Sequence, residues 1–185
     1  DHWSVGTQIL MEANPAWGDR STLTQKLEEA LFTQGGSSAE IKSHFARRAP
    51  DSGVGLAALA SAYLAEGNTD EARRLAAKAW RETILPAALE PGFLVRFGAL
   101  LTPADHKWRL DRLLIEDIRW NGEKSQRAAV VRRLIPLLPA AEQKKANARL
   151  AVFLGSDGAR KSIETLPAER VPDWGLVFHR IQALR

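Results

Sequence analysis

A short stretch of sequence decides the fold class: residues 55–80 read "GLAALASAYLAEGNTDEARRLAAKAW". In each half, apolar side chains recur at i, i+3, i+4, i+7 and i+8, the spacing that makes one stripe along a helix. The first stripe is Leu56, Leu59, Ala60, Tyr63 and Leu64, and the second is Ala72, Leu75, Ala76, Ala79 and Trp80. Because so many of these side chains are small, the two helices can approach closely. The stretch therefore predicts an antiparallel helix pair.

The turn between the two halves carries its own signals. Gly67 and Asn68 are suited to the left-handed conformation that ends a helix, and Thr69 is suited to cap the next one. The pair resembles one tetratricopeptide repeat, a motif of about 34 residues that does not recur cleanly elsewhere in the chain. The positions that carry this resemblance are Leu56, Leu59, Ala60, Tyr63, Gly67, Ala72 and Ala79.

The rest of the chain also shows helical periodicity, and no segment alternates as a strand does. Ser37 and Glu40 form a capping box for a further helix that carries Ile41 and Phe45. We therefore predict an all-α chain built as an α-α superhelix of stacked antiparallel helix pairs, one superhelical domain over residues 1–185. Other predicted inward stripes are Leu23, Leu27, Ala30 and Leu31; Val131, Leu134, Ile135 and Leu138; Ala146, Leu150, Phe153 and Leu154; and Trp174, Val177, Phe178 and Ile181.

The amino-acid composition of the chain argues against several classes of function. The net charge of +4 is spread as basic doublets among acidic residues, whereas nucleic-acid binders concentrate their charge, so we expect no nucleic-acid partner. The chain has no cysteine, which excludes disulfides, thiolate nucleophiles and Cys-based zinc sites. Its longest uncharged stretch, residues 52–65, is shorter than the roughly 20 apolar residues that a membrane span needs. We expect no membrane span.

A cluster of chemically active residues occurs in "GALLTPADHKWRLDRLL", residues 98–114. Thr102 is a good N-cap, Pro103 fits the first helical position, and Asp105 completes a capping box. Arg109 lies within i+4 reach of Asp105, and His106 lies beside the predicted core. The cluster contains no nucleophile, and the other histidines stand alone: His2, His44 and His179. We therefore expect a structural role here, with no catalytic, cofactor-binding or metal-binding residue in the chain.

The six tryptophans raise a second hypothesis, a sugar-stacking surface, since aromatic faces bind carbohydrate rings. Trp80 and Trp174 lie on apolar stripes and are expected to pack between helices. Trp108 and Trp120 have no such assignment and are the candidates for ligand contact. Trp3 and Trp17 complete the set.

With these residues in hand, residues 45–185 resemble the helical, non-catalytic part of bacterial soluble lytic murein transglycosylases. The resemblance rests on residues 56–82, on "FLVRFGALLTPADHKWRLDRLL" and on "ARLAVFL"; residues 1–44 are not part of it. The connection "IEDIRWNGEKSQRAAV" is longer here than in many members of that family. The residues that match the family motif are Leu100, Leu101, Thr102, Asp105, His106, Arg109, Asp111, Leu113 and Leu114.

The resemblance implies a periplasmic protein whose ring-shaped or U-shaped superhelix supports a separate lysozyme-like domain that cleaves peptidoglycan. That domain uses a Glu followed by Ser, together with a Gly-Leu-Met-Gln motif, and neither occurs here; the single methionine is Met11. We expect the chain, which starts at Asp1, to be a piece of a longer enzyme whose partners are peptidoglycan and its own C-terminal catalytic domain. The alternative is a free-standing tetratricopeptide-like adaptor that binds a protein or peptide in a concave face.

Overall fold

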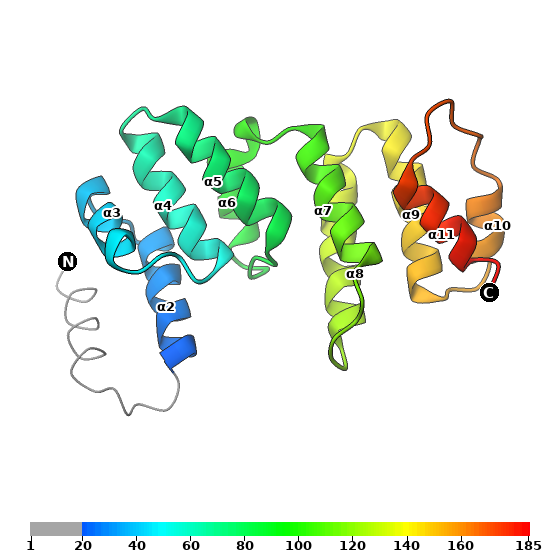
Figure 1. Cartoon of the computed structure of the whole chain (residues 1–185), viewed down its shortest axis with the longest axis horizontal. Helices are drawn as coiled ribbons and strands as arrows, with labels where there is room; N and C mark the ends of the chain where they lie inside the picture. Colours follow the sequence, from blue (N-terminus) through cyan, green and yellow to red (C-terminus); the bar gives the residue numbers. More distant parts are fainter. Residues whose placement is uncertain (1–19) are drawn as a thin grey trace. The chain divides into compact units, whose positions relative to one another are not determined.

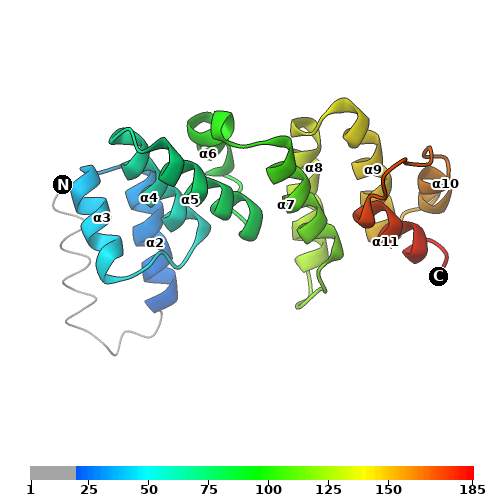
Figure 2. The same ribbon diagram turned by 45° about the horizontal axis from the view of Figure 1, so that its top comes forward.

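The computed structural model describes residues 20–185, and every regular element in that range is a helix (Figures 1 and 2). The described chain divides into two compact units, an N-terminal unit that ends at Leu101 and a C-terminal unit over Thr102–Arg185. The N-terminal unit contains α2 (Arg20–Thr33), α3 (Ser38–Arg47), α4 (Gly53–Ala65), α5 (Thr69–Glu82), α6 (Glu90–Phe97) and the short 3-10 helix η1 (Gly98–Leu100). The C-terminal unit contains α7 (Pro103–Ile115), α8 (Glu123–Leu134), the 3-10 helix η2 (Ile135–Leu137), α9 (Ala140–Leu154), α10 (Ala159–Glu164) and α11 (Trp174–Gln182).

The predicted helix pair is present as α4 and α5, which lie side by side (Figure 1). All five residues of the predicted α5 stripe are buried, so that prediction is confirmed. The α4 stripe is only partly right, because Ala60 is buried while the larger residues predicted with it are half-buried. Helix α4 contacts α2, α3 and α5, and a helix with neighbours on several sides buries more than one stripe. Its buried apolar residues are Val54, Ala57, Ala58, Ala60 and Ala62.

The turn between α4 and α5 is nearly as predicted. Gly67 has φ of 79°, the left-handed conformation expected after a helix end. The cap of α5, however, is Asn68, whose side-chain oxygen accepts a 3.2 Å hydrogen bond from the Glu71 N–H. Thr69 is the first helical residue, so its predicted capping role is wrong. Asn is as good a cap as Thr and stands one position earlier.

Three buried aromatic side chains pack against one another inside the N-terminal unit. Trp80 on α5 is fully buried and stacks on Phe93 of α6, with ring centroids 5.6 Å apart and planes inclined by 8°. Phe93 in turn contacts Phe97, at 5.1 Å between centroids. The predicted packing role of Trp80 is confirmed. The Ser37 and Glu40 capping box is also present, and Ile41 and Phe45 are buried.

A buried carboxylate fixes the start of α4. Glu28 on α2 is 1% exposed and accepts hydrogen bonds from the backbone N–H groups of Asp51 and Ser52, at 2.7 and 3.0 Å, and from the Ser52 hydroxyl. The first N–H groups of a helix have no partner inside the helix, so this carboxylate supplies one. The site leaves no room beside it: a Cβ on Gly55 would lie 2.4 Å from Glu28 Cδ.

In the C-terminal unit, the whole stripe predicted along α8, η2 and the residue after η2 is buried: Val131, Leu134, Ile135 and Leu138. Arg127 on α8 is also buried, and its guanidinium donates to the carbonyl groups of Glu116 (2.7 Å) and Asp117 (2.9 Å) after the end of α7. The same guanidinium pairs with Glu123 at 2.7 Å. This one side chain thereby fixes the long connection between α7 and α8.

Helices α9, α10 and α11 pack together (Figure 2) through a cluster of Ala148, Ile163 and Leu176. The predicted α11 stripe is wrong: Trp174 and Ile181 are exposed, and Val177 and Phe178 are only half-buried. The face of α11 that packs inward instead carries Gly175, Leu176 and His179. On α9, Ala146 and Leu150 are buried as predicted, whereas Phe153 and Leu154 are half-buried.

Candidate functional site

The cluster at the start of α7 is a helix cap. The Thr102 hydroxyl accepts from the Asp105 N–H at 3.3 Å, while the Asp105 carboxylate accepts from the Thr102 N–H and hydroxyl, each at 2.7 Å. Pro103 is the first helical residue, and Asp105 is fully buried. The predicted capping box is therefore confirmed. Because the side chains of Thr102 and Asp105 both bind within the cap, their presence is explained by helix capping and requires no catalytic role.

His106 and Arg109 follow on the next turn. Arg109 is 1% exposed, and the predicted pairing of its side chain with Asp105 stays a prediction. His106 is half-buried, and burial lowers its pKa; the positive charge of Arg109 acts in the same direction, against the opposing effect of Asp105. The His106 imidazole is therefore mostly neutral at pH 7. His44 and His179 lie on other helices, and no group of three metal-ligating side chains occurs among residues 20–185.

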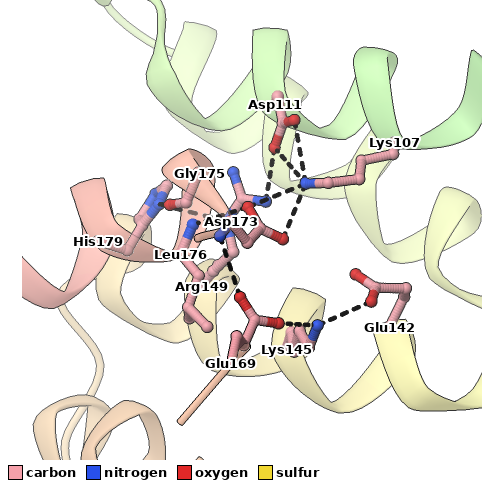
Figure 3. Close-up of polar contacts among 10 residues, drawn as sticks. All are labelled: Lys107, Asp111, Glu142, Lys145, Arg149, Glu169, Asp173, Gly175, Leu176 and His179. Atoms are coloured by element: carbon pink, nitrogen blue, oxygen red, sulfur yellow. Dashed lines mark hydrogen bonds and ion pairs between the residues drawn. The ribbon is translucent and has the colours of Figure 1, made fainter. Parts of the chain in front are cut away.

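The structure brings together a different set of polar residues, which sequence reasoning missed (Figure 3). Lys107 on α7 lies between two carboxylates, 3.2 Å from Asp111 on the same helix and 3.0 Å from Asp173, the N-cap of α11. Arg149 on α9 is 1% exposed and pairs with Asp111 at 2.6 Å. Two cations and two carboxylates thus alternate across three helices. We call Lys107, Asp111, Arg149 and Asp173 the charge cluster.

The electrostatics of Asp173 follow from these contacts. Burial alone raises the pKa of this carboxyl group, but the hydrogen bond and positive charge of Lys107 and the N–H of Leu176 together lower it below its ordinary value. Asp173 is therefore ionised at neutral pH. Its backbone N–H donates to Glu169 at 3.1 Å, and Glu169 also pairs with Lys145 of α9 (Figure 3). The loop before α11 is thereby attached to α9.

His179 lies at the inner end of the cluster and is fully buried. Its Nδ1 is 2.8 Å from the Gly175 carbonyl oxygen and 3.3 Å from Nε of Arg149, while its Nε2 has no hydrogen-bond partner. Burial is the largest influence on its pKa and lowers it, and the nearby Arg149 guanidinium acts in the same direction. In a neutral ring, a protonated Nδ1 donates to the Gly175 carbonyl oxygen, whereas an unprotonated Nδ1 accepts from the Arg149 Nε–H, so the tautomer decides which of the two contacts is a hydrogen bond.

Tryptophan exposure separates the packing residues from the ligand candidates. Trp108 is 57% exposed and Trp120 51%, and Trp174, predicted to be buried, is 75% exposed. Trp108 directly follows Lys107 on α7, and Trp174 directly follows Asp173. Trp3, Trp17, His2 and Met11 lie outside the described residues. The C-terminal unit therefore presents three indoles to solvent, two of them next to the charge cluster.

Comparison with protein-family models, with curated proteins and with solved structures finds no match to this chain. Among the described residues, no helix is both long enough and apolar enough to cross a bilayer. In the charge cluster, two carboxylates form ion pairs with one ammonium group and one guanidinium group, so the charges neutralise one another. The tryptophans that follow Lys107 and Asp173 in the sequence are exposed.

Proposed function

We propose that this chain is a non-catalytic superhelical domain of a soluble lytic murein transglycosylase. In this proposal it binds peptidoglycan glycan strands in the periplasm and supports a separate C-terminal lysozyme-like domain that cleaves them. The stacked, tetratricopeptide-like superhelix over residues 1–185 belongs to the same proposal. The helix pairs of both units are compatible with it, because such superhelices are built from antiparallel helices that each contact their neighbours.

The observation that carries the proposal is the exposure of indoles in the C-terminal unit. Trp108 and Trp174, which directly follow two residues of the charge cluster, are each more than half exposed, whereas Trp80 in the N-terminal unit is fully buried. A single exposed aromatic side chain needs no explanation, but exposed aromatic side chains beside one polar cluster are typical of an interaction site. The motif "LLTPADHKWRLDRLL", which carries the family resemblance, includes Trp108 and supplies the capped α7 beneath it.

The alternative, a tetratricopeptide-like adaptor, is favoured by one observation. Helix α11 and the segments on either side of it expose aliphatic side chains that a sugar does not need, namely Val171, Ile181 and Leu184. Apolar patches of this kind also occur where a protein partner docks. The adaptor therefore predicts binding to a polypeptide and no affinity for glycans.

Sedimentation with purified peptidoglycan tests the proposal. The chain is expected to co-sediment with insoluble sacculi and to release no anhydro-muropeptides, since the Glu-Ser and Gly-Leu-Met-Gln motifs are missing from its sequence. Absence of binding would contradict the proposal, and robust release of anhydro-muropeptides would contradict the non-catalytic assignment. The full reading frame gives a second test: a continuation past Arg185 that contains both motifs supports the transglycosylase and excludes the adaptor, and a stop codon there does the reverse.

A further inference from the structure

We propose that Trp108 and Trp174, together with the accessible parts of Lys107 and Asp111, form a saccharide subsite on the C-terminal unit. The ligand class is an uncharged saccharide chain. This inference rests on the proposed function, because it names the surface through which the domain would hold a glycan strand. It uses residues from α7 and α11 that are far apart in the sequence.

The first argument is position. A 3.0 Å ion pair joins Lys107 to Asp173, and each of these residues is followed directly by an exposed tryptophan. Consecutive Cα atoms are about 3.8 Å apart, so the backbone of each tryptophan adjoins that of an ion-paired residue. Figure 3 shows Lys107 reaching from α7 to Asp173 at the start of α11. Both tryptophans are therefore carried by the two segments that this ion pair joins.

The second argument concerns the polar groups between the rings. On α7, Trp108 and Asp111 are three residues apart and hence neighbours on the helix surface. The side chains of Lys107 and Asp111 keep about a third of their surface exposed, 35% and 32%. An ammonium group donates to sugar hydroxyl oxygens, and a carboxylate accepts from sugar hydroxyl groups. Aromatic faces combined with a few fixed polar groups are the usual composition of a small-ligand site.

The third argument is charge, and it selects the ligand. Each cation of the charge cluster is already paired with a carboxylate: Lys107 with Asp111 and Asp173, and Arg149 with Asp111. A polyanion such as nucleic acid, or an anionic bilayer, would need unpaired positive charge. An apolar protein surface would remove the cluster from water without replacing its hydrogen bonds, which is costly. A sugar brings its own hydroxyl groups and is neutral, so it fits both the rings and the ions.

Binding of chitotetraose, a soluble chain of N-acetylglucosamine, tests the subsite directly by calorimetry. Trp108→Ala and Trp174→Ala are each expected to weaken binding about tenfold, the effect of losing one aromatic contact. Both side chains are more than half exposed, so circular dichroism of the variants should match that of the unaltered chain. The matched control is Trp120→Ala: Trp120 is also exposed but is not adjacent to the charge cluster, and its loss should leave the affinity unchanged.

Conservative variants distinguish stacking from general apolar docking. Trp174→Phe keeps an aromatic face and should retain most of the affinity, whereas Trp174→Leu keeps only apolar surface and should lose about as much as alanine. If Leu is as good as Phe, or if Ile181→Ser on the outer side of α11 weakens binding as much as Trp174→Ala, the saccharide subsite is wrong.

The same titrations separate this inference from the proposed function. If the unaltered chain binds sacculi and chitotetraose but the Trp108 and Trp174 variants bind equally well, the subsite is overturned and the glycan-binding function stands. If the unaltered chain binds neither sacculi nor chitotetraose, both are overturned. Loss of binding in the two variants with retention in Trp120→Ala supports both.

Discussion

In the N-terminal unit, α4 and α5 meet through alanines and α5 meets α6 through a stacked aromatic pair, whereas in the C-terminal unit α7, α9 and α11 meet through charged side chains. The buried charged residues of the described N-terminal unit are Glu28 and Glu90. Those of the C-terminal unit are Asp105, Arg109, Glu123, Arg127 and Arg149, and the neutral His179 is buried as well. An apolar interior is stabilised mainly by area removed from water and does not titrate. An interior with ion pairs depends on each partner being present and in the right protonation state.

The pair of Glu123 and Arg127 illustrates the second kind of interior. Glu123 accepts from the Arg119 backbone N–H at 2.6 Å and from the Arg127 guanidinium at 2.7 Å. These contacts lower the pKa of Glu123 to about 2, with the Arg119 N–H the largest influence. The carboxylate is therefore charged over the whole range in which most proteins are stable. Loss of Glu123 alone would leave the buried Arg127 guanidinium without this carboxylate partner.

The largest effect on stability is expected in the apolar interior. Trp80→Ala removes a fully buried indole that stacks on Phe93, and truncating a buried aromatic residue costs about 3–5 kcal/mol. Urea denaturation followed by far-UV circular dichroism measures the loss. Hydrogen exchange should show the decreased protection in peptides from α4, α5 and α6. Trp120→Ala is the control, because its side chain is exposed; equal losses in the two variants would mean that Trp80 is not a core residue.

The next effect is expected where α11 approaches the charge cluster. A Cβ on Gly175 would lie 2.5 Å from Asp111 Oδ1 and 2.6 Å from Arg149 Nη2, so Gly175→Ala must push these groups apart. We expect a loss of about 1–3 kcal/mol, the range for overpacking a well-packed site. Gly92→Ala on α6 is the matched control, since a Cβ there meets nothing within 4 Å. The control should be neutral or slightly stabilising, because Ala favours a helix more than Gly does.

A stability of Gly175→Ala equal to that of the Gly92 variant would contradict the close approach of α11 to α7 and α9. A loss in both variants would point instead to a general sensitivity of the helices to substitution. Only a loss confined to Gly175 agrees with the packing described here.

These contacts also explain how far the sequence predicts the structure. Capping boxes at Ser37 and Thr102 and the stripe of α5 were predictable, because each depends on residues within one or two turns of the chain. The inward face of α11 was not, because it carries Gly175 and His179, whose partners Asp111 and Arg149 lie on other helices. Periodicity of apolar residues cannot identify an inward face that is built from a glycine and a neutral histidine.

The charge cluster was missed for the same reason. Lys107 and Asp173 are 66 positions apart, and nothing local marks them as a pair. The sequence marks Trp108 and Trp120 as ligand candidates because neither lies on an apolar stripe, and both side chains are exposed. The prediction that Trp174 is buried is wrong, as it is for the rest of the α11 stripe. Because Trp174 is exposed, a second exposed indole follows a residue of the charge cluster.

Acid should weaken the C-terminal unit through His179. Burial lowers the pKa of this imidazole in the folded chain, so the folded state binds fewer protons than the unfolded state, where the ordinary value is 6.5. The stabilising contribution of the neutral ring is therefore complete above about pH 6.5 and is lost as the pH falls through the lowered value. Urea midpoints measured from pH 8 down to pH 5 should decrease, and His179→Gln should reduce that decrease.

His44→Gln provides the comparison in the N-terminal unit. His44 also has a pKa lowered by burial, but it is half-buried, so its removal should change the pH dependence less. Unchanged pH dependence in His179→Gln would contradict a fully buried neutral ring in contact with Arg149.

The smallest effect is expected on the outer side of α11, and it tests the orientation of that helix most directly. Ile181 is 54% exposed, so Ile181→Ser should change the free energy of unfolding by less than about 0.5 kcal/mol, as exposed substitutions usually do. Leu176 is 1% exposed and contacts Ala148 and Ile163, so the same change at Leu176 should destabilise the unit clearly. If the two variants exchanged ranks, the apolar stripe predicted from the sequence would be the inward face after all, and Gly175 and His179 would not pack against Arg149.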